Sequence, residues 1–253
     1  MEMDYVGKVA VASGAASGMG LVFSRNIVAR GGNMVMADIN AGRLAECVDE
    51  LNAMGPGKAL GVVCDVREYA QVCHVRDAAV EAFGRVDLVV NFAGGTATRV
   101  LGVDGQLEFP DIPIEVFDWG IDVNLRAQFY FGHAMMKQMR EQKSGLIINI
   151  GSITGVEGDG HGMDYPTAKS GAMNGLTTSL AQYGAQYGIR CVCVSPGPVL
   201  TRPAMARMKT LLGRAADPQE IIDLILFLDS PQGQFINGTN IMIDGGRAAM
   251  PRA

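Results

Sequence analysis

Clusters of basic residues are missing from this sequence. Its 21 lysines and arginines are scattered, and 26 acidic residues bring the net charge to −5 and the pI to about 5.2. Nucleic acids and anionic membranes attract concentrated positive charge, so we expect neither as a partner. Residues 1–14, MEMDYVGKVAVASG, place acidic residues before a short apolar run, which is typical of neither a signal peptide nor a membrane span.

Metal-binding and disulfide spacings are missing as well. The three histidines lie far in sequence from the five cysteines, and no two cysteines have CxxC spacing. We therefore expect no metal site. We expect free thiols, buried or partly buried, in a reducing compartment, most simply the cytoplasm. The cysteines are Cys47, Cys64, Cys73, Cys191 and Cys193.

Short apolar runs alternate with helical stretches along the whole chain. The Val- and Ile-rich runs predict strands buried on both faces, which is typical of an α/β doubly wound Rossmann fold with seven mostly parallel strands. No linker, low-complexity tract or short repeat interrupts the pattern, so we expect residues 1–253 to form a single domain. The expected strands are 8–13, 33–38, 59–65, 86–91, 145–152, 189–195 and 240–244; the expected helices are 18–29, 41–54, 67–83, 124–140, 165–187 and 218–229, with a long loop between 91 and 124.

A glycine-rich turn joins the first expected strand to the first expected helix. It reads SGAASGMG over residues 13–20, with Gly14, Gly18 and Gly20 in GxxxGxG spacing. Such a turn lets the backbone approach a pyrophosphate, whose charge is favoured by free N–H groups at the helix start. Tight packing alone would also explain the glycines, but the position between a strand and a helix favours dinucleotide binding.

An acidic residue ends the second expected strand. Asp38 follows the last glycine of the turn by 18 residues, close to where dinucleotide-binding folds hold the ribose hydroxyls of adenosine. Its carboxylate would repel a 2′-phosphate, and Ala16, Ser17, Ile39 and Asn40 offer no cation to offset that repulsion. These residues predict NAD rather than NADP. The alternative is that Asp38 only caps the next helix.

A tyrosine and a lysine stand four residues apart in GMDYPTAKSG. On a helix this spacing places Tyr165 and Lys169 on one face, and a cation near a tyrosine hydroxyl lowers its pKa from the usual value near 10. Ser152 ends an expected strand 13 residues upstream, at the edge where parallel sheets bind ligands. Ser152 can then hold a substrate oxygen while Tyr165 transfers a proton. Asn124, at the start of another helix, can complete a polar relay.

Three of these residues also have ordinary structural explanations. Ser152 can cap a turn, Tyr165 can belong to the core, and Lys169 can lie on a solvated helix face. The order of the whole set favours chemistry, because a glycine turn, an acid, a strand-end serine and then the tyrosine and lysine each occupy a fitting place in the sheet.

With these motifs the chain resembles the short-chain dehydrogenase/reductase family, in its compact single-domain branch. The resemblance spans residues 5–247, and the motifs occur in the family's order: CDV at 64–66, NFAGG at 91–95, DVNL at 122–125, INIGS at 148–152, SPGPVLT at 195–201 and NGTNIMIDGG at 237–246. It implies an enzyme that moves hydride reversibly between an alcohol and a nicotinamide cofactor, while the protein supplies orientation and proton transfer.

The resemblance also implies a role for each matching residue. Tyr165 would be the general acid and base, and Lys169 would lower its pKa and bind the nicotinamide ribose. Ser152 would orient the carbonyl, and Asn124 would anchor a relay water. The residues expected at the cofactor are Ser13, Gly14, Ser17, Gly18, Met19, Gly20, Asp38 and Ile39; Asp65 and Val66 at the adenine; Asn91, Ala93 and Gly94 along its flank; Tyr165 and Lys169; and Pro196, Gly197, Val199 and Thr201 around the nicotinamide.

Two stretches differ in length from the family pattern. Residues 95–124 are longer than usual, and residues 201–218, where the family has its substrate lid, are shorter. We expect the 96–112 loop to take over part of the covering, so that deletion of 99–109 changes KM for the substrate.

The substrate is a small molecule whose pocket is expected between 153–163, 95–100 and 199–208. The NAD-type acid and the polar side chains of the first stretch favour a sugar or polyol-like alcohol. A 3-oxoacyl reductase and a hydroxysteroid dehydrogenase are alternatives within the family, and a non-catalytic nucleotide-binding scaffold is an alternative from another class. The polar candidates are Glu157, Asp159 and His161; the apolar ones are Met163, Met205 and Met208, which are adaptable.

Small residues follow Tyr165 on its helix. They allow another helix to approach closely, although packing on the chain's own sheet explains them equally well. The resemblance implies that this helix and the 124–140 helix pair across two-fold axes, so we expect a homotetramer or homodimer. The small residues are Ala168, Gly171, Ala172, Gly175, Thr178 and Ser179.

Overall fold

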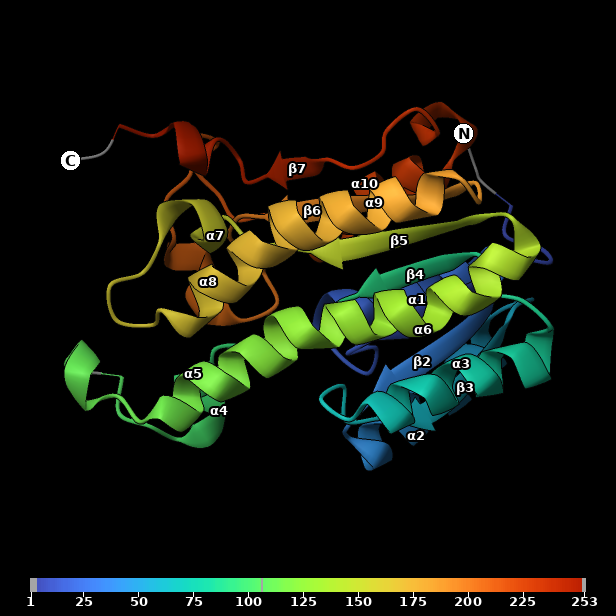
Figure 1. The fold of residues 1–253 in the computed structure, drawn as a ribbon, viewed down its shortest axis with the longest axis horizontal. Coiled ribbons are helices and arrows are strands. Elements are labelled where there is room, and N and C mark those ends of the chain that lie inside the picture. Colours follow the sequence, from blue (N-terminus) through green and yellow to red (C-terminus); the bar gives the residue numbers. More distant parts are fainter. Residues whose placement is uncertain (1–3, 106, 252–253) are drawn as a thin grey trace.

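Seven strands form one sheet in the order β3-β2-β1-β4-β5-β6-β7, and every neighbouring pair is parallel (Figure 1). The computed structural model describes residues 4–105 and 107–251. The sheet was predicted to be mostly parallel, and within the described residues it is wholly parallel. The strands are β1 Val9–Ser13, β2 Asn33–Asp38, β3 Lys58–Val63, β4 Leu88–Asn91, β5 Gly145–Ile150, β6 Ile189–Pro196 and β7 Asn240–Ile243.

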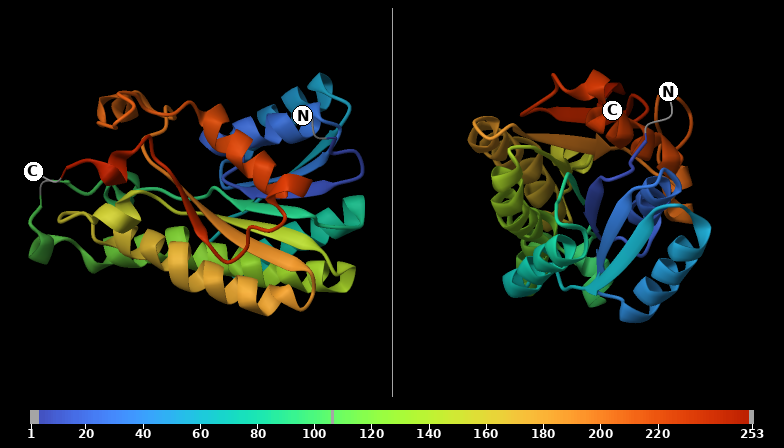
Figure 2. Two further views of the ribbon diagram at one scale, coloured as in Figure 1. Left: turned by 90° about the horizontal axis from the view of Figure 1, so that it is seen from above. Right: turned by 90° about the vertical axis from the view of Figure 1, so that its right-hand side faces the viewer.

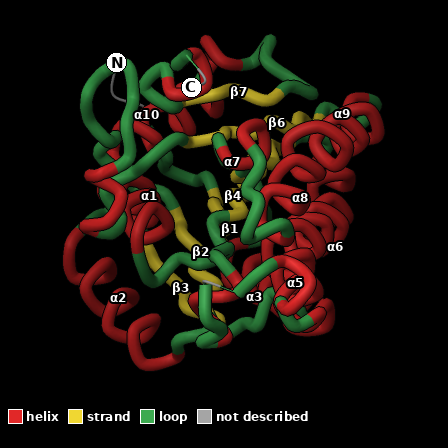
Figure 3. The backbone as a smooth tube through the Cα atoms, turned by 90° about the vertical axis from the view of Figure 1, so that its left-hand side faces the viewer, coloured by secondary structure: helices red, strands yellow, loops and turns green. Residues whose placement is uncertain are grey.

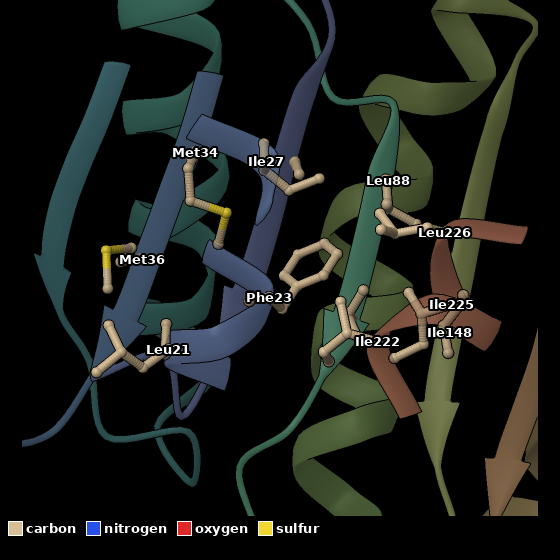
Figure 4. Packing of buried hydrophobic residues seen from close by; sticks show 14 of the residues in the cluster. Leu21, Phe23, Ile27, Met34, Met36, Leu88, Ile148, Ile222, Ile225 and Leu226 are labelled. Carbon is tan, nitrogen blue, oxygen red and sulfur yellow. The ribbon is translucent and has the colours of Figure 1, made fainter. Parts of the chain in front are cut away.

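Helices cover both faces of the sheet, so each strand alternates its side chains between two cores (Figures 2 and 3). In β1, Ala10 and Ala12 belong to one core, whereas Val9 and Val11 belong to the other. The first core lies under α1 Gly18–Ala29, α2 Ala41–Met54 and α10 Pro218–Asp229, and Figure 4 shows Phe23 and Ile222 packed within it. The second lies under α3 Tyr69–Phe83, α6 Ala127–Gln142 and α9 Thr177–Ala185. Burial on both faces explains the continuous apolar runs of the sequence.

The long loop predicted between β4 and residue 124 is partly helical, which corrects the sequence-based expectation. It contains α4 Ala97–Leu101, the 3₁₀ turn η1 Phe109–Asp111 and α5 Ile114–Ile121. This stretch contains Pro110 and Pro113, which are compatible with a loop. Pro113, however, precedes the first turn of α5, where a residue without an N–H costs no helical hydrogen bond. The α5 helix then continues through η2 Asp122–Arg126 into α6, so the helix expected at 124 begins ten residues earlier.

Two turns of π-helix interrupt the long helices near the C-terminal edge of the sheet. One is η2, and the other is η3 Ala172–Leu176, which lies between α8 Asp164–Gly171 and α9. The predicted helix 165–187 is therefore α8, η3 and α9 in succession. A π-helical turn leaves a carbonyl without its usual i+4 partner. In these turns, Thr177 Oγ1 donates to the carbonyl of Ala172 at 2.6 Å, and Gln128 Nε2 donates to the carbonyl of Asn124 at 2.7 Å.

Strand ends and connecting segments gather on one side of the molecule. The arrowheads of β2, β4, β5 and β7 point to the left of Figure 1, and Figure 3 looks onto that side. The short helix α7 Thr154–Glu157, which was not predicted, the start of α8, the α4–α5 segment and the last described residues all lie there. A parallel sheet binds ligands at this edge.

All five cysteines are free, four of them buried and Cys73 partly buried, as predicted. Among the residues that the structure describes, no group of three or more His, Cys, Asp or Glu side chains is placed to hold a metal ion. No described helix has both the length and the apolar character needed to cross a bilayer.

Candidate active site

The three glycines of the first turn do different things. A Cβ atom on Gly14 would lie 2.9 Å from the backbone of Ala93, and one on Gly20 would collide with the carbonyl of Gly14, so both glycines serve close packing. Gly18 has φ +51°, and its free side opens toward the Thr201 side chain, 3.5 Å from such a Cβ. Only this glycine has both the left-handed backbone and the space that a ligand needs.

The first turn of α1 leaves its amides available. Ser17 occupies the N-cap position, but its side chain makes no capping hydrogen bond, and the turn has no acidic residue. Met19 is partly buried behind it. Unpaired N–H groups and the positive end of the helix dipole favour an anion here, so this end of α1 fits a pyrophosphate.

Asp38 holds two backbone segments with one carboxylate. Its Oδ2 accepts from the Ala16 amide at 2.9 Å and its Oδ1 from the Asn40 amide at 3.0 Å. The N-cap of α2 is Asn40, whose side chain accepts from the Arg43 amide, so Asp38 does not cap that helix. No described lysine, arginine or histidine forms an ion pair with Asp38.

The residues that follow β2 and β3 lie beside Asp38 at the same edge of the sheet. Ile39 is 64 % exposed, which leaves an apolar surface beside Asp38, and Val66 is buried three residues after β3 ends. Asp65 pairs with Arg67 at 2.6 Å. Hydrogen bonds from Arg67 hold the pKa of the Asp65 carboxyl below its usual value, so it stays ionised.

The side chain of Asn91, a residue expected to flank the cofactor, points into the sheet. It is 1 % exposed, and its Nδ2 donates to Oδ1 of Asn149 on the adjacent strand at 3.0 Å. The side-chain amide of Asn91 therefore lies between β4 and β5. The backbone that follows remains at the edge, where the Ala93 amide donates to Ser13 Oγ at 3.2 Å.

The segment after β6 also divides into packed and open residues. Gly197 lies against the backbone of Asp244, where a Cβ would come within 2.7 Å, and Val199 is buried and bridges to Ala216. Pro196 ends the strand, and its carbonyl accepts from the Ile153 amide at 2.9 Å. Thr201 is exposed next to Gly18 and therefore borders the same space as the glycine turn.

Ser152 and Tyr165 lie together at the C-terminal edge of the sheet. Burial raises the pKa of Tyr165 above its usual value, and a hydrogen bond with Ser152 and the charge of Arg202 offset part of that rise. Ser152 is 8 % exposed, and its Oγ accepts from the Thr154 amide at 3.2 Å. The tyrosine therefore holds its proton at neutral pH.

Lys169 shares a helix face with Tyr165, but its ammonium group is not directed at the hydroxyl. It lies 5.5 Å from the centroid of the tyrosine ring and donates to the carbonyl of Ile150 at 2.8 Å. Burial is the largest influence on the Tyr165 pKa in this structure, and the groups that offset it are Ser152 and Arg202. The lowering of this pKa by Lys169 stays a prediction. Burial also lowers the pKa of Lys169 itself to about 8.

Replacement of Lys169 by methionine is expected to stabilise the fold at neutral pH. The pKa of Lys169 falls from 10.5 to about 8, so its buried charge costs roughly 3 kcal/mol of folding free energy below pH 8. As pH rises from 8 to 10.5, the folded state loses the proton first and the cost disappears. In urea unfolding, Lys169→Met should have a higher free energy of unfolding than the wild type at pH 7. The two free energies should converge above pH 10.5. Lys137→Met, at an exposed position, is the control. If the difference in unfolding free energy between Lys169→Met and the wild type did not change with pH, the burial of a charged Lys169 would not be its cause.

Asn124 ties two elements together by its side-chain amide. Its Oδ1 accepts from the Gly95 amide at 3.0 Å, and its Nδ2 donates to the Gly95 carbonyl at 2.9 Å. It is wholly buried in the η2 turn, and its Oδ1 would lie 2.7 Å from a Cβ on Gly94. Only glycine at 94 therefore lets the loop reach both Asn124 and Lys169.

Sequence reasoning missed three residues of this site. Gln128 is buried and donates to the Ile150 carbonyl at 3.1 Å, the same oxygen that accepts from Lys169. Asp164 is 2 % exposed, and burial raises the pKa of its carboxyl above the usual range, although the Ala97 and Tyr165 amides counter the rise. Its position next to Tyr165 was the only available signal. Arg202 acts on Tyr165 through space, which no sequence spacing reveals.

A family comparison accounts for this arrangement of turn, acid, serine, tyrosine and lysine. Residues 8–211 match the family described as short chain dehydrogenase. The chain belongs to the short-chain dehydrogenase family. This short-chain dehydrogenase is accordingly an oxidoreductase that uses a nicotinamide cofactor.

Similar proteins cover nearly the whole of this short-chain dehydrogenase. Trans-4-hydroxycyclohexanecarboxylate dehydrogenase from Sinomonas cyclohexanicum is 40% identical over 96% of this chain and 93% of its own. The 7alpha-hydroxysteroid dehydrogenase of Bacteroides fragilis is 31% identical over 94% and 93%. The solved structure of NAD+-bound xylitol dehydrogenase superposes with a TM-score of 0.86 at 26% identity, covering 96% of this chain and 100% of that one.

Proposed function

We propose that this enzyme interconverts a secondary alcohol and a ketone with NAD, and that Tyr165 is its general acid and base. The observation that carries the proposal is that Ser152 and Tyr165 lie together at the sheet edge that also holds the uncapped end of α1. Hydride chemistry needs both a dinucleotide site and a proton-transfer group in one place. When bound, the nicotinamide cofactor accepts or supplies the hydride.

The remaining steps fall to the residues of the chain. In ketone reduction, Ser152 Oγ donates a hydrogen bond to the carbonyl oxygen, and Tyr165 Oη donates the proton that completes the alcohol. In alcohol oxidation, Tyr165 Oη takes up the hydroxyl proton. The raised pKa of Tyr165 keeps this proton available for reduction at neutral pH. Lys169 positions the tyrosine ring, and Asn124 holds the loop at Gly95.

The cofactor is proposed to be NAD rather than NADP. Asp38 places an ionisable carboxyl at the end of β2 with no cationic partner among the described residues, and its oxygens keep lone pairs free for ribose hydroxyls. A 2′-phosphate at this position would meet a like charge. Ile39 adds an exposed apolar surface for the adenine.

The substrate is proposed to be a small secondary alcohol. The polar loop after β5 favoured a sugar or polyol, but Glu157 is engaged by Arg247, and Asp159 accepts from the His161 amide at 3.0 Å. The names of the similar proteins include a polyol dehydrogenase and two enzymes of ring alcohols, so both kinds of substrate stay within the proposal. A 3-oxoacyl reductase is the alternative. A solved structure named as such an enzyme holds NAD, so the choice between the two substrates falls to the turnover assay.

A turnover assay separates these possibilities. Purified enzyme is mixed with NADH and a panel of cyclic ketones, ketoses and a 3-oxoacyl thioester, and absorbance of NADH is followed; the matching alcohols are tested with NAD. Turnover of at least one small ketone with NADH supports the proposal. Binding of NADH without any turnover would favour a non-catalytic scaffold.

The helix α6 and the segment before the edge strand β7 are proposed to join copies of the chain into a homodimer or homotetramer. On α6, Phe129 is 46 % exposed beside Tyr130 and His133. On the β7 side, Phe235 is completely exposed. Apolar side chains on two separate surfaces support two interfaces.

The free thiols support a reducing location such as the cytoplasm.

A further inference from the structure

A cavity of about 380 Å³ lies where three segments meet beyond the strands β5, β6 and β7. Its walls are Val156 and Glu157 of α7, residues 207–209, and residues 247–251. The α7 helix begins two residues after Ser152 and is a single turn, roughly 6 Å long. The wall formed by Val156 and Glu157 therefore lies within five residues of Ser152 along the chain.

Positive charge is concentrated in this cavity. Arg207, Lys209 and Arg247 line it, against one carboxylate, that of Glu157. The protein as a whole carries a charge of −5, so the local excess opposes the overall sign. A cavity with walls of one charge sign attracts ligands of the other.

Only one of the three cations is neutralised. Arg247 contacts Glu157 at 2.9 Å and also donates to the carbonyl of Lys209 at 3.1 Å, so it joins all three walls. Neither Arg207 nor Lys209 takes part in an ion pair with another described residue. Both are exposed. Arg207 and Lys209 are therefore two unpaired cations at a cavity whose three walls are joined by Arg247.

The rest of the lining is apolar. Val156 is 49 % exposed, and Met208, Met250 and Pro251 complete the surface. Methionine adapts its shape to an apolar ligand, and the volume suits a small molecule. An apolar wall with two free cations fits a molecule that has a hydrocarbon body and an anionic end.

We propose that this cavity is the outer part of the substrate site and that Arg207 and Lys209 bind a carboxylate carried by the substrate. The enzyme would then act on hydroxy acids and oxo acids in which the carboxylate lies away from the reacting carbon. This inference rests on the proposed function, because the reacting carbon is placed at Ser152 and Tyr165.

A binding experiment tests the carboxylate site without relying on turnover. Cyclohexanecarboxylate and cyclohexanecarboxamide are titrated calorimetrically into the wild type, Arg207→Met, Lys209→Met and the double variant, with Lys137→Met as a control for loss of a surface charge. The acid should bind at least about tenfold more tightly than the amide, as charge-assisted hydrogen bonds allow. The double variant should lose this preference, and Lys137→Met should keep it.

A second measurement separates this proposal from the proposed function. The ratio of kcat/KM for an oxo acid to kcat/KM for the matching neutral ketone, both with NADH, should fall at least tenfold in Arg207→Met and in Lys209→Met, and it should stay unchanged in Lys137→Met. Equal binding of acid and amide, or a preference that survives in the double variant, would overturn the carboxylate site. Absence of turnover with any ketone would overturn the proposed function and leave the binding result to decide on the site.

Discussion

Replacement of Tyr165 by phenylalanine is expected to lower kcat by roughly a thousandfold or more. The change removes one hydroxyl, the group that we propose to transfer the proton, and general acid–base catalysis is typically worth 10² to 10⁴ in rate. The ring remains, so its contact with Lys169 at 5.5 Å survives. Steady-state kinetics with the best ketone of the panel and NADH measures the loss.

The cofactor site should be unaffected by this change. Fluorescence titration is expected to give a Kd for NADH in Tyr165→Phe within a few fold of the wild-type value, because the change removes one hydroxyl and leaves the glycine turn, Asp38 and Lys169 in place. Tyr183, which is 47 % exposed, provides a matched control, and Tyr183→Phe should keep full activity. If Tyr165→Phe retained more than about a tenth of wild-type kcat, the proposed mechanism would be wrong.

Replacement of Asp38 by asparagine is expected to shift the preference for NADPH over NADH by about a hundredfold. The carboxylate opposes a 2′-phosphate and accepts from ribose hydroxyls, and like charges in contact cost several kcal/mol, of which 1.4 kcal/mol corresponds to each factor of ten. Asparagine keeps an acceptor for only one of the Ala16 and Asn40 amides, which now bond to separate oxygens of Asp38 at 2.9 and 3.0 Å, so the stability of the variant is measured as well. The ratio of kcat/KM values for the two cofactors measures the shift.

Asp49→Asn makes the same charge change at an exposed position on α2, and it should leave the ratio unchanged. A thermal melt of Asp38→Asn shows whether the glycine turn still folds. Equal use of NADH and NADPH by the wild type, or an unchanged ratio in Asp38→Asn, would contradict the assignment of NAD.

Local spacing was a good guide to the strands, the helices and the order of the site residues. The periodicity of β1 and α1 and the position of Asp38 at a strand end depend on neighbours in sequence, so they could be predicted. The start of α5 could not, because the same prolines suit a loop or a helix start, and packing of α5 against α8 decides between them.

The charge states of the site were beyond sequence reasoning. Four-residue spacing placed Lys169 on the same face as Tyr165, but the direction of its ammonium group depends on the Ile150 carbonyl, which lies 19 residues away in the chain. Burial then lowers the pKa of Lys169 and raises that of Tyr165. Desolvation is a property of the surrounding fold.

The sequence alone determined that this protein has a parallel sheet with a glycine turn, a strand-end acid and a serine, tyrosine and lysine at one edge, because helix and strand periods place such residues. Only the tertiary structure decided that Asn91 turns into the sheet and that Arg207 and Lys209 meet residues 247–251 around one cavity. Those contacts join segments about 40 or more residues apart, and no local pattern in a chain encodes which distant segments will pack together.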